Sequence, residues 1–418
     1  MNKKKGSKVV PNVRFKGFTD DWKQRKLGEV CLRVQGNDGR MDLPTLTISA
    51  SNGWMNQEDR FSGNIAGKEQ KNYTLLHKGE LSYNHGNSKL AKYGTVFSLQ
   101  SYKEALVPRV YHSFKVEKGS PDFIEYYFAT KLPDRELGKL ISSGARMDGL
   151  LNIGYNEFMG IQMLFPSVEE QKQISNYFRS LDHLITLHQQ KITLLTKLKK
   201  TMLEKMFPKK GSVIPEFRFN GFANAWEQRK LGDIADVTKL AGFEFTEHVV
   251  YSDEGNIIAL RGLNIKNGQL ILDDVKYIDG SNFSKLSRSK LFINDIMFTY
   301  VGTVGEVAII KEDDRFYLAP NVSRIRVKSD DSPKFISHYM RTDNFKNKVI
   351  FPLIATSSQP ALSMENIRKF TINIPINREE QDYLAKYFDS LDHLINLHQR
   401  KIDMLKNMKK AMLDQMFI

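Results

Sequence analysis

The sequence predicts an α+β protein of two tandem halves, each with a short opening motif, a variable α+β domain and one long helix. Three observations predict this organisation. Two motifs recur at offsets of 204 and 210 in a chain of 418 residues, two segments of 39 residues lack Gly and Pro, and short β-rich runs fill the stretches between them. With two copies, the pattern is an internal duplication and not a solenoid.

The opening motifs are the first repeated element. One reads Pro-Asn-Val-Arg-Phe-Lys-Gly-Phe from Pro11, followed by Trp22 and by Gln-Arg-Lys-Leu-Gly at 24–28. The other reads Pro-Glu-Phe-Arg-Phe-Asn-Gly-Phe from Pro215, followed by Trp226 and by the same pentapeptide at 228–232. We expect each motif to begin one structural half.

The variable domains, roughly residues 31–165 and 235–374, share little sequence. Short runs rich in β-branched and aromatic residues predict strands, and longer runs without breakers predict helices. The expected strands are Leu43–Ser49, Tyr93–Leu99, Tyr111–Val116, Ile257–Leu260, Gln269–Leu272, Lys290–Tyr300 and Glu306–Ile310, and the expected helices are Asp122–Leu132 and Phe335–Lys348.

The long helices follow the variable domains, at Glu169–Phe207 and Glu379–Phe417, and share Ser-Leu-Asp-His-Leu-Ile at 180–185 and 390–395. Apolar steps of three and four residues predict a coiled-coil seam. The seam residues are Phe178, Leu181, Ile185, His188, Ile192, Leu195, Phe388, Leu391, Ile395, His398, Ile402 and Leu405. A second apolar stripe predicts partner docking through Leu184, Leu187, Leu194, Leu394 and Leu397.

A helix of 39 residues spans ~58 Å, which exceeds one turn of DNA, ~34 Å. We therefore expect two long helices packed on each other that act as a spacer. A helical hairpin inside one globular core is the alternative. His188 and His398 lie on the seam, where a histidine is most often structural. His183 and His188 are five residues apart, which does not fit the i, i+4 spacing of metal ligands.

Charge points to a polyanionic partner. The formal net charge is +14, which favours nucleic acid, although charged runs also form ordinary solvated surfaces. Residues 1–209 hold 33 Lys and Arg against 21 Asp and Glu, and the remainder hold 29 against 27. Much of the excess lies in the first ten residues and in 191–210, so the variable domains must touch a polyanion through local patches.

Polar and basic loops in the variable domains supply such patches, because amides, guanidinium groups and hydroxyls pair with base edges and phosphates. In the first domain the candidate DNA-binding residues are Tyr83, Asn84, Asn87, Ser88, Lys89, Lys92, Ser143 and Arg146. In the second they are Arg261, Asn264, Thr299, Tyr300, Thr303, Ser357, Ser358 and Gln359.

Several classes of protein are excluded or disfavoured. The chain is 41% hydrophobic and 26% charged, as in globular proteins. No run approaches the ~18 apolar residues of a membrane span, and the start lacks the core of a signal peptide, so we expect a cytoplasmic protein. One cysteine, Cys31, permits no internal disulfide or cysteine zinc cluster. No phosphate-binding loop, dinucleotide fingerprint or amino-methyltransferase tetrapeptide occurs. We expect no catalytic residue, metal or cofactor in this chain.

With these motifs the sequence resembles the specificity (S) subunit of type I restriction–modification systems over nearly its whole length. The resemblance rests on Arg-Phe-x-Gly-Phe…Trp…Lys-Leu-Gly at 14–28 and 218–232. It rests equally on Pro…Glu-Glu-Gln…Tyr-Phe…Ser-Leu-Asp-His-Leu-Ile…Gln-x-Lys-Ile from Pro166 and from Pro375. Occurring in tandem, the combination is specific.

The resemblance implies two target-recognition domains separated by an antiparallel coiled coil of two conserved helices, with pseudo-two-fold, circular organisation. It implies the divisions 1–165 (opening motif and first recognition domain), 166–210 (first spacer helix), 211–374 (opening motif and second recognition domain) and 375–418 (second spacer helix). Each domain would read half of a bipartite site in double-stranded DNA. The subunit would be non-catalytic and would dock two adenine-N6 methyltransferase (M) subunits and restriction (R) subunits, which carry S-adenosylmethionine, ATP and Mg.

Two other classes of function stay open. A stand-alone sequence-specific DNA-binding regulator is the first alternative. An enzyme, either a nuclease or a fused restriction–methylation polypeptide, is the second, and the missing methyltransferase motifs argue against it.

Overall fold

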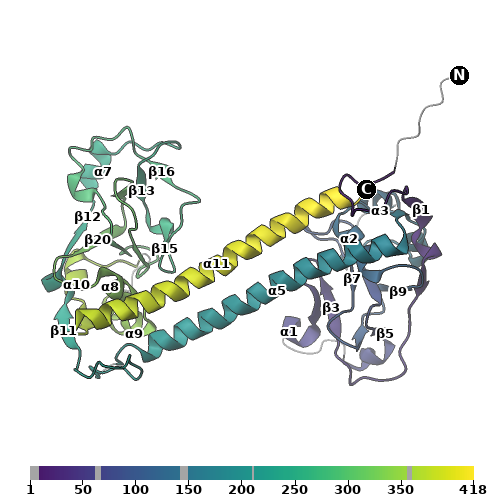
Figure 1. Ribbon diagram of the computed structural model, residues 1–418, viewed down its shortest axis with the longest axis horizontal. Helices are drawn as coiled ribbons and strands as arrows, with labels where there is room; N and C mark the ends of the chain where they lie inside the picture. The colour runs from purple at the N-terminus through teal and green to yellow at the C-terminus, as the bar shows by residue number, and fades with distance from the viewer. Residues whose placement is uncertain (1–8, 62–66, 142–148, 210, 355–359) are drawn as a thin grey trace. The chain divides into compact units, whose positions relative to one another are not determined.

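The structure, a computed structural model, describes residues 9–61, 67–141, 149–209, 211–354 and 360–418 (Figure 1). The chain divides into two compact units. Unit 1 contains residues 1–189 and 400–418, and unit 2 contains residues 190–399. The helices α5 (Val168–Lys205) and α11 (Arg378–Met416) therefore each have one end in unit 1 and the other end in unit 2.

Unit 1 contains a four-stranded antiparallel sheet in the order β2-β9-β6-β7. Its strands are β2 (Cys31–Arg33), β9 (His112–Val116), β6 (Leu81–Asn84) and β7 (Thr95–Ser98). Three two-stranded sheets accompany it: β1 (Lys23–Lys26) with β10 (Gln162–Phe165), β3 (Leu46–Ser49) with β4 (Gly53–Asn56), and β5 (Thr74–His77) with β8 (Glu104–Val107). The helices are α1 (Gln57–Phe61), α2 (Pro121–Ala129), α3 (Asp134–Lys139) and α4 (Tyr155–Met159), with 3-10 turns at Leu27–Glu29 and Gly67–Asn72.

Unit 2 contains a four-stranded antiparallel sheet in the order β12-β20-β17-β18. Its strands are β12 (Ala235–Lys239), β20 (Val322–Val327), β17 (Ile296–Thr299) and β18 (Val307–Ile309). Other strands are β11 (Glu227–Lys230) with β21 (Thr371–Ile374), β14 (Ile265–Lys266) with β15 (Gln269–Leu270), and β16 (Lys276–Tyr277), β13 (Ile258–Leu260) and β19 (Phe316–Leu318) in one sheet. The helices are α6 (Leu231–Ile234), α7 (Gly242–His248), α8 (Pro333–Met340), α9 (Asp343–Phe345) and α10 (Met364–Arg368), with short 3-10 or π segments at Gly262–Asn264, Ser287–Ser289, Lys346–Ile350 and Phe351–Leu353.

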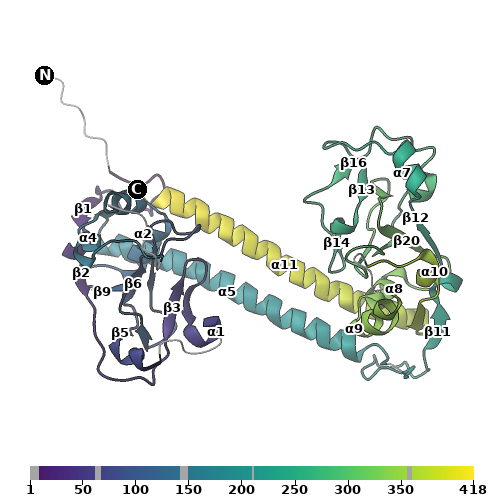
Figure 2. The ribbon, with the colours of Figure 1, turned by 180° about the vertical axis from the view of Figure 1, so that it is seen from behind.

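The two variable domains share the topology of the four-stranded sheet although their sequences differ. In each unit the first strand of the four-stranded sheet pairs with the last, and the hairpin β6–β7 or β17–β18 completes the order. A strand from each opening motif, β1 or β11, pairs with the strand just before the long helix, β10 or β21. Each variable domain therefore begins and ends at this pair of strands, next to the start of its long helix (β1 and β11 in Figure 2).

The same local signals start equivalent helices. Ser120 and Ser332 cap α2 and α8 by accepting from the amides of Phe123 and Phe335, and proline occupies the first turn of both. The α5 helix begins after Ser167, whose hydroxyl accepts from the amide of Glu170 at 3.2 Å.

The long helices run antiparallel within each unit. In unit 1 the Phe178 ring lies 5.9 Å from that of Phe417, and Asp182, one turn on, accepts from Lys409, which lies earlier in α11. In unit 2 the Phe388 ring lies 5.5 Å from that of Phe207, and Asp392 pairs with Lys199. The predicted fold class, α+β with paired long helices in a duplicated arrangement, is confirmed.

Most expected elements are shorter than predicted, and two of them are interrupted well inside their predicted bounds. The strand expected over Lys290–Tyr300 begins at Ile296, because Asn294 has a positive φ of 70° and Asp295 accepts from the amide of Phe292 in a turn. The helix expected over Phe335–Lys348 stops at Met340, because Thr342 is extended and starts a new helix.

Within the described ranges, no helix is long and apolar enough to cross a membrane. In the same ranges, no cluster of three or more His, Cys, Asp or Glu residues is arranged to hold a metal ion.

Candidate nucleic-acid interface

Buried ion pairs fasten each opening motif to the start of its helix. Arg14 donates from Nε and Nη2 to the two carboxylate oxygens of Glu170 at 2.6 and 2.7 Å. Arg218 makes the same two bonds to Glu380 at the same distances. Both carboxylates are buried, and the hydrogen bonds that Arg14 donates to Glu170 raise the pKa of Arg14. Bidentate geometry holds the base of each variable domain in register with its helix.

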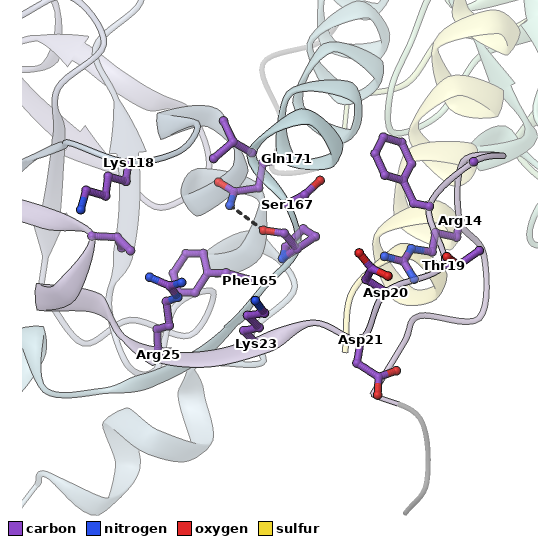
Figure 3. A pocket seen from close by; sticks show the side chains of 15 residues that line it. Arg14, Thr19, Asp20, Asp21, Lys23, Arg25, Lys118, Phe165, Ser167 and Gln171 are labelled. Carbon is purple, nitrogen blue, oxygen red and sulfur yellow. Dashed lines mark hydrogen bonds between the residues drawn. The ribbon is translucent and has the colours of Figure 1, made fainter.

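Figure 3 shows the cavity of about 340 Å³ at this joint in unit 1. Its lining brings together the cations Lys23, Arg25 and Lys118 and the carboxylates Asp20 and Asp21. The Gln171 amide donates to the carbonyl of Pro166 at 3.1 Å. The cavity lining contains none of the predicted DNA-binding residues, so we treat it as part of the joint.

The candidate surface of unit 1 is formed where three segments meet at one end of the four-stranded sheet. The loop after β6 is held by Asn87, whose amide donates to Gly149 at 3.0 Å, and by the Leu151 amide, which donates to His85 at 2.8 Å. The buried ring of His85 has Nδ1 2.7 Å from the Leu151 carbonyl oxygen and Nε2 2.9 Å from that of Val110. The turn before β9 thus joins the same surface.

Four of the predicted residues in domain 1 are exposed on this surface, namely Asn87, Ser88, Lys89 and Lys92. Two others have structural roles. Asn84 is half-buried and accepts from the Gly86 amide at 3.1 Å, which shapes the turn. Tyr83 is fully buried, stacks on Phe158 at 4.2 Å and donates its hydroxyl to the Tyr93 carbonyl. Tyr83 therefore packs inside the domain, and its contact with DNA stays a prediction. Ser143 and Arg146 lie outside the described residues.

The equivalent end of the sheet in unit 2 carries a cavity of about 380 Å³. Two predicted loops converge there, since Arg261 and Thr303 both line it. Residues 360–362 run beside the loop after β17, because Gly302 donates to Pro360 at 3.0 Å and Leu362 donates to Tyr300 at 2.8 Å. The three-segment arrangement of unit 1 is therefore repeated.

Of the predicted residues in domain 2, Thr303 is exposed and Arg261 is partly exposed, with its Nη2 donating to Asp274 Oδ1 at 2.8 Å. Tyr300 is almost buried beneath the Lys239 ammonium, 5.5 Å from the ring centroid. Asn264 and Thr299 are buried and bond to neighbouring backbone groups. Their side chains are therefore engaged within unit 2, and their contact with DNA stays a prediction. Ser357, Ser358 and Gln359 lie outside the described residues.

Two turns that were not predicted to bind DNA, one before β9 and one before β20, also reach these surfaces. They bring Arg109, which is exposed, to the surface of unit 1, and Asn321 to the cavity of unit 2. The signal was present: Pro108-Arg109-Val110 and Pro320-Asn321-Val322 recur at an offset of 212. Exposed Tyr251 and Leu263 beside Arg261 were missed as well.

The helices present two kinds of apolar residue. The seam residues Phe178, Leu181, Ile185, Leu195, Phe388, Leu391, Ile402 and Leu405 are buried, and His188, Ile192, Ile395 and His398 are partly buried. The residues predicted for partner docking are exposed, at 42% for Leu184, 45% for Leu187, 60% for Leu194, 39% for Leu394 and 38% for Leu397.

Comparison with known proteins adds three findings. Residues 224–407 match the family described as type I restriction modification DNA specificity domain. The chain is 23% identical over 301 residues to the type I restriction enzyme MjaVIII specificity subunit of Methanocaldococcus jannaschii. The matched region covers 70% of this chain and 69% of that protein. It is 26% identical over 201 residues to the putative type I restriction enzyme MjaX specificity subunit of the same organism, with 46% and 45% covered.

Among solved structures, the fold is similar to that of a type I restriction-modification system S subunit from M. genitalium. The TM-score is 0.63 at 12% sequence identity, with 98% of this chain and 99% of that chain covered. At this identity the likeness concerns the fold.

Proposed function

We propose that this chain is a specificity subunit of the type I restriction–modification family, as its sequence predicts, and that it recognises one bipartite DNA site for such a complex. Each variable domain reads one half of the site in double-stranded DNA. The α5 and α11 helices set the unread gap and dock two adenine-N6 methyltransferase subunits and, through them, restriction subunits. The chain itself is non-catalytic and acts in the cytoplasm.

One observation carries this proposal: the same three-segment surface occurs at the same end of the same sheet in both units. In unit 1 it exposes Lys89, Lys92 and Arg109, and in unit 2 it presents Arg261 and Thr303. Different polar groups on one repeated scaffold fit two readers of different half-sites, because base-edge contacts specify sequence. Two half-sites also multiply specificity, since each mismatched base pair costs ~1–3 kcal/mol, roughly additively.

The test is an exchange of one variable domain. Replacing residues 31–165 with those of a relative should change one half of the methylated sequence, as read by genome-wide mapping of N6-methyladenine in cells that also make the methyltransferase. A change in both halves contradicts modular reading. Sequence-specific DNA binding without any co-purifying methyltransferase would instead support the stand-alone regulator.

The docking part of the proposal has its own test. Leu187→Lys and Leu397→Lys place charges on the exposed leucine face and should weaken co-purification of the methyltransferase more than binding of DNA by the chain. The matched control is Lys172→Ala, an exposed change on α5 away from the leucines. Normal assembly by the doubly substituted chain would show that this face has another role.

A further inference from the structure

One reversal of charge distinguishes the two helices where they contact α2 and α8. Phe178–Ile185 and Phe388–Ile395 are identical at seven of eight positions, and the exception places Arg179 opposite Asp389 in the alignment. The helices that pack there, α2 and α8, also correspond. The segments 120–130 and 332–342 share Ser, Pro, Phe, Ile, Tyr and Thr at matching positions.

In unit 1 the helix supplies the cation and the variable domain supplies the anions. Arg179 Nη2 donates to Asp122 Oδ1 at 2.6 Å and to Glu125 Oε2 at 2.8 Å. The same nitrogen donates to the Ser98 hydroxyl at 2.7 Å. Side-chain exposure is 29% for Arg179, 23% for Asp122 and 11% for Glu125, so this is a partly desolvated cluster and not a free surface pair.

In unit 2 the signs are reversed. Asp389 Oδ2 lies 3.3 Å from the Lys334 ammonium, and Asp389 Oδ1 lies 2.9 Å from His338 Nε2. Lys334 occupies the α8 position that Asp122 occupies in α2, and Ser337 replaces Glu125. Arg341, one turn further along α8, pairs with Asp392 at 3.0 Å. The contact surface of α8 is therefore basic and that of α2 is acidic.

The apolar part of the same contact does not distinguish the units. Trp22, Phe123 and Phe178 in unit 1 correspond to Trp226, Phe335 and Phe388 in unit 2, and all six are buried. Shape and hydrophobicity alone would let either variable domain dock on either helix. In the wrong pairing Arg179 would face Lys334, and Asp389 would face Asp122 and Glu125, so both contacts would become repulsive.

We propose that the start of each long helix is a charge-keyed docking surface that accepts one chemical class of variable domain. The α5 surface fits a domain whose first helix presents carboxylates, and the α11 surface fits one whose first helix presents cations. The key rejects the wrong pairing more than it stabilises the right one, since a partly exposed ion pair contributes little by itself. It limits which recognition domains can occupy each position. The inference rests on the contacts within each unit and not on the proposed function.

The test compares one double substitution in two arrangements of the full chain. In the first, the domains keep their places; in the second, residues 27–165 and 231–374 are exchanged. Arg179→Asp with Asp389→Arg should lower the midpoint of thermal unfolding of the native arrangement by about 3–10 °C and raise that of the exchanged arrangement by a similar amount. Opposite signs support the proposal, and a loss or no change in both arrangements overturns it. DNA is absent, so the result is independent of DNA reading.

A second measurement uses only the native arrangement, so it tests the proposal even where the exchanged chain does not fold. Arg179→Asp alone should lower the unfolding midpoint, and adding Asp122→Lys and Glu125→Ser, which copies the arrangement of unit 2, should restore at least half of the loss. The matched control is Lys172→Asp, a charge reversal at an exposed position of the same helix, which should change the midpoint by less than about 2 °C. No recovery in the triple variant overturns the proposal.

Discussion

Replacing Phe417 with alanine tests how the end of α11 holds variable domain 1. The Phe417 side chain is 5% exposed. Its ring centroid lies 5.3 Å from that of Phe123, 5.7 Å from Tyr127, 5.9 Å from Phe178 and 6.2 Å from Trp22. These rings belong to the opening motif, α2 and α5, so one side chain joins three elements of unit 1.

The expected loss is large because the site is enclosed by rigid rings. Truncating a buried phenylalanine costs about 3–5 kcal/mol, which combines lost transfer free energy with the cavity left behind. For a unit of about 200 residues, each kcal/mol lowers the unfolding midpoint by roughly 2–4 °C. The Phe417→Ala chain should therefore unfold about 6–20 °C lower in the transition that reports unit 1.

Calorimetry measures the midpoint, and hydrogen exchange with mass spectrometry locates the change, which should appear first in peptides covering α2 and β1. Phe207→Ala should produce the same effect in unit 2, because Phe207 lies 5.5–6.0 Å from Phe388, Phe335 and Trp226. The control Met404→Ala removes a side chain that is 56% exposed and should stay within about 0.5 kcal/mol. A loss below about 1 kcal/mol for Phe417→Ala would refute the packing argument.

Three further predictions concern buried polar groups. Glu170→Ala strands the Arg14 cation and should cost about 3–5 kcal/mol in urea unfolding, whereas Arg14→Met with Glu170→Met should cost less. Burial lowers the pKa of His338. The unfolded chain therefore binds more protons than the folded chain below about pH 6.5. The free energy of unfolding should then fall between pH 7 and pH 5, and it should fall more steeply than in His338→Gln. An equal pH dependence in both chains would show that His338 is not its cause. Burial raises the pKa of Cys31 to about 12, so iodoacetamide at pH 7.5 should label the native chain far more slowly than the urea-unfolded chain; equal rates would contradict this.

The packing of the long helices was predictable because it depends on the spacing of apolar residues along each helix. The steps of three and four residues from Phe178 to Leu195 and from Phe388 to Leu405 identify buried positions without knowledge of the partner helix. The variable domains were less predictable. Their topology depends on pairing between strands far apart in sequence, such as β2 with β9 and β12 with β20, and no local pattern specifies such pairing.

The loops that were predicted to touch DNA lie at the candidate surfaces, and several of their polar residues have structural roles inside the domain. Asn84 and Thr299 end the strands β6 and β17, and Asn264 ends a short 3-10 segment; in this structure their side chains satisfy nearby backbone groups. Such local bonds compete with intermolecular ones. Sequence alone does not show which polar side chain in a turn is already used, whereas burial does.

Comparison of the two halves gives information that neither half provides alone. Where residues are the same, as in Arg14 with Glu170 and Arg218 with Glu380, the structure uses them for one scaffold. Differences at equivalent positions fall into two groups. Those in the exposed turns before β9 and β20, such as Arg109 against Asn321, change what the surface presents. The difference between Arg179 and Asp389 is accompanied by opposite changes in the packed helix, so it preserves a contact within each unit. A compensated difference therefore indicates a requirement of assembly, and an uncompensated one at the surface indicates a difference in ligand.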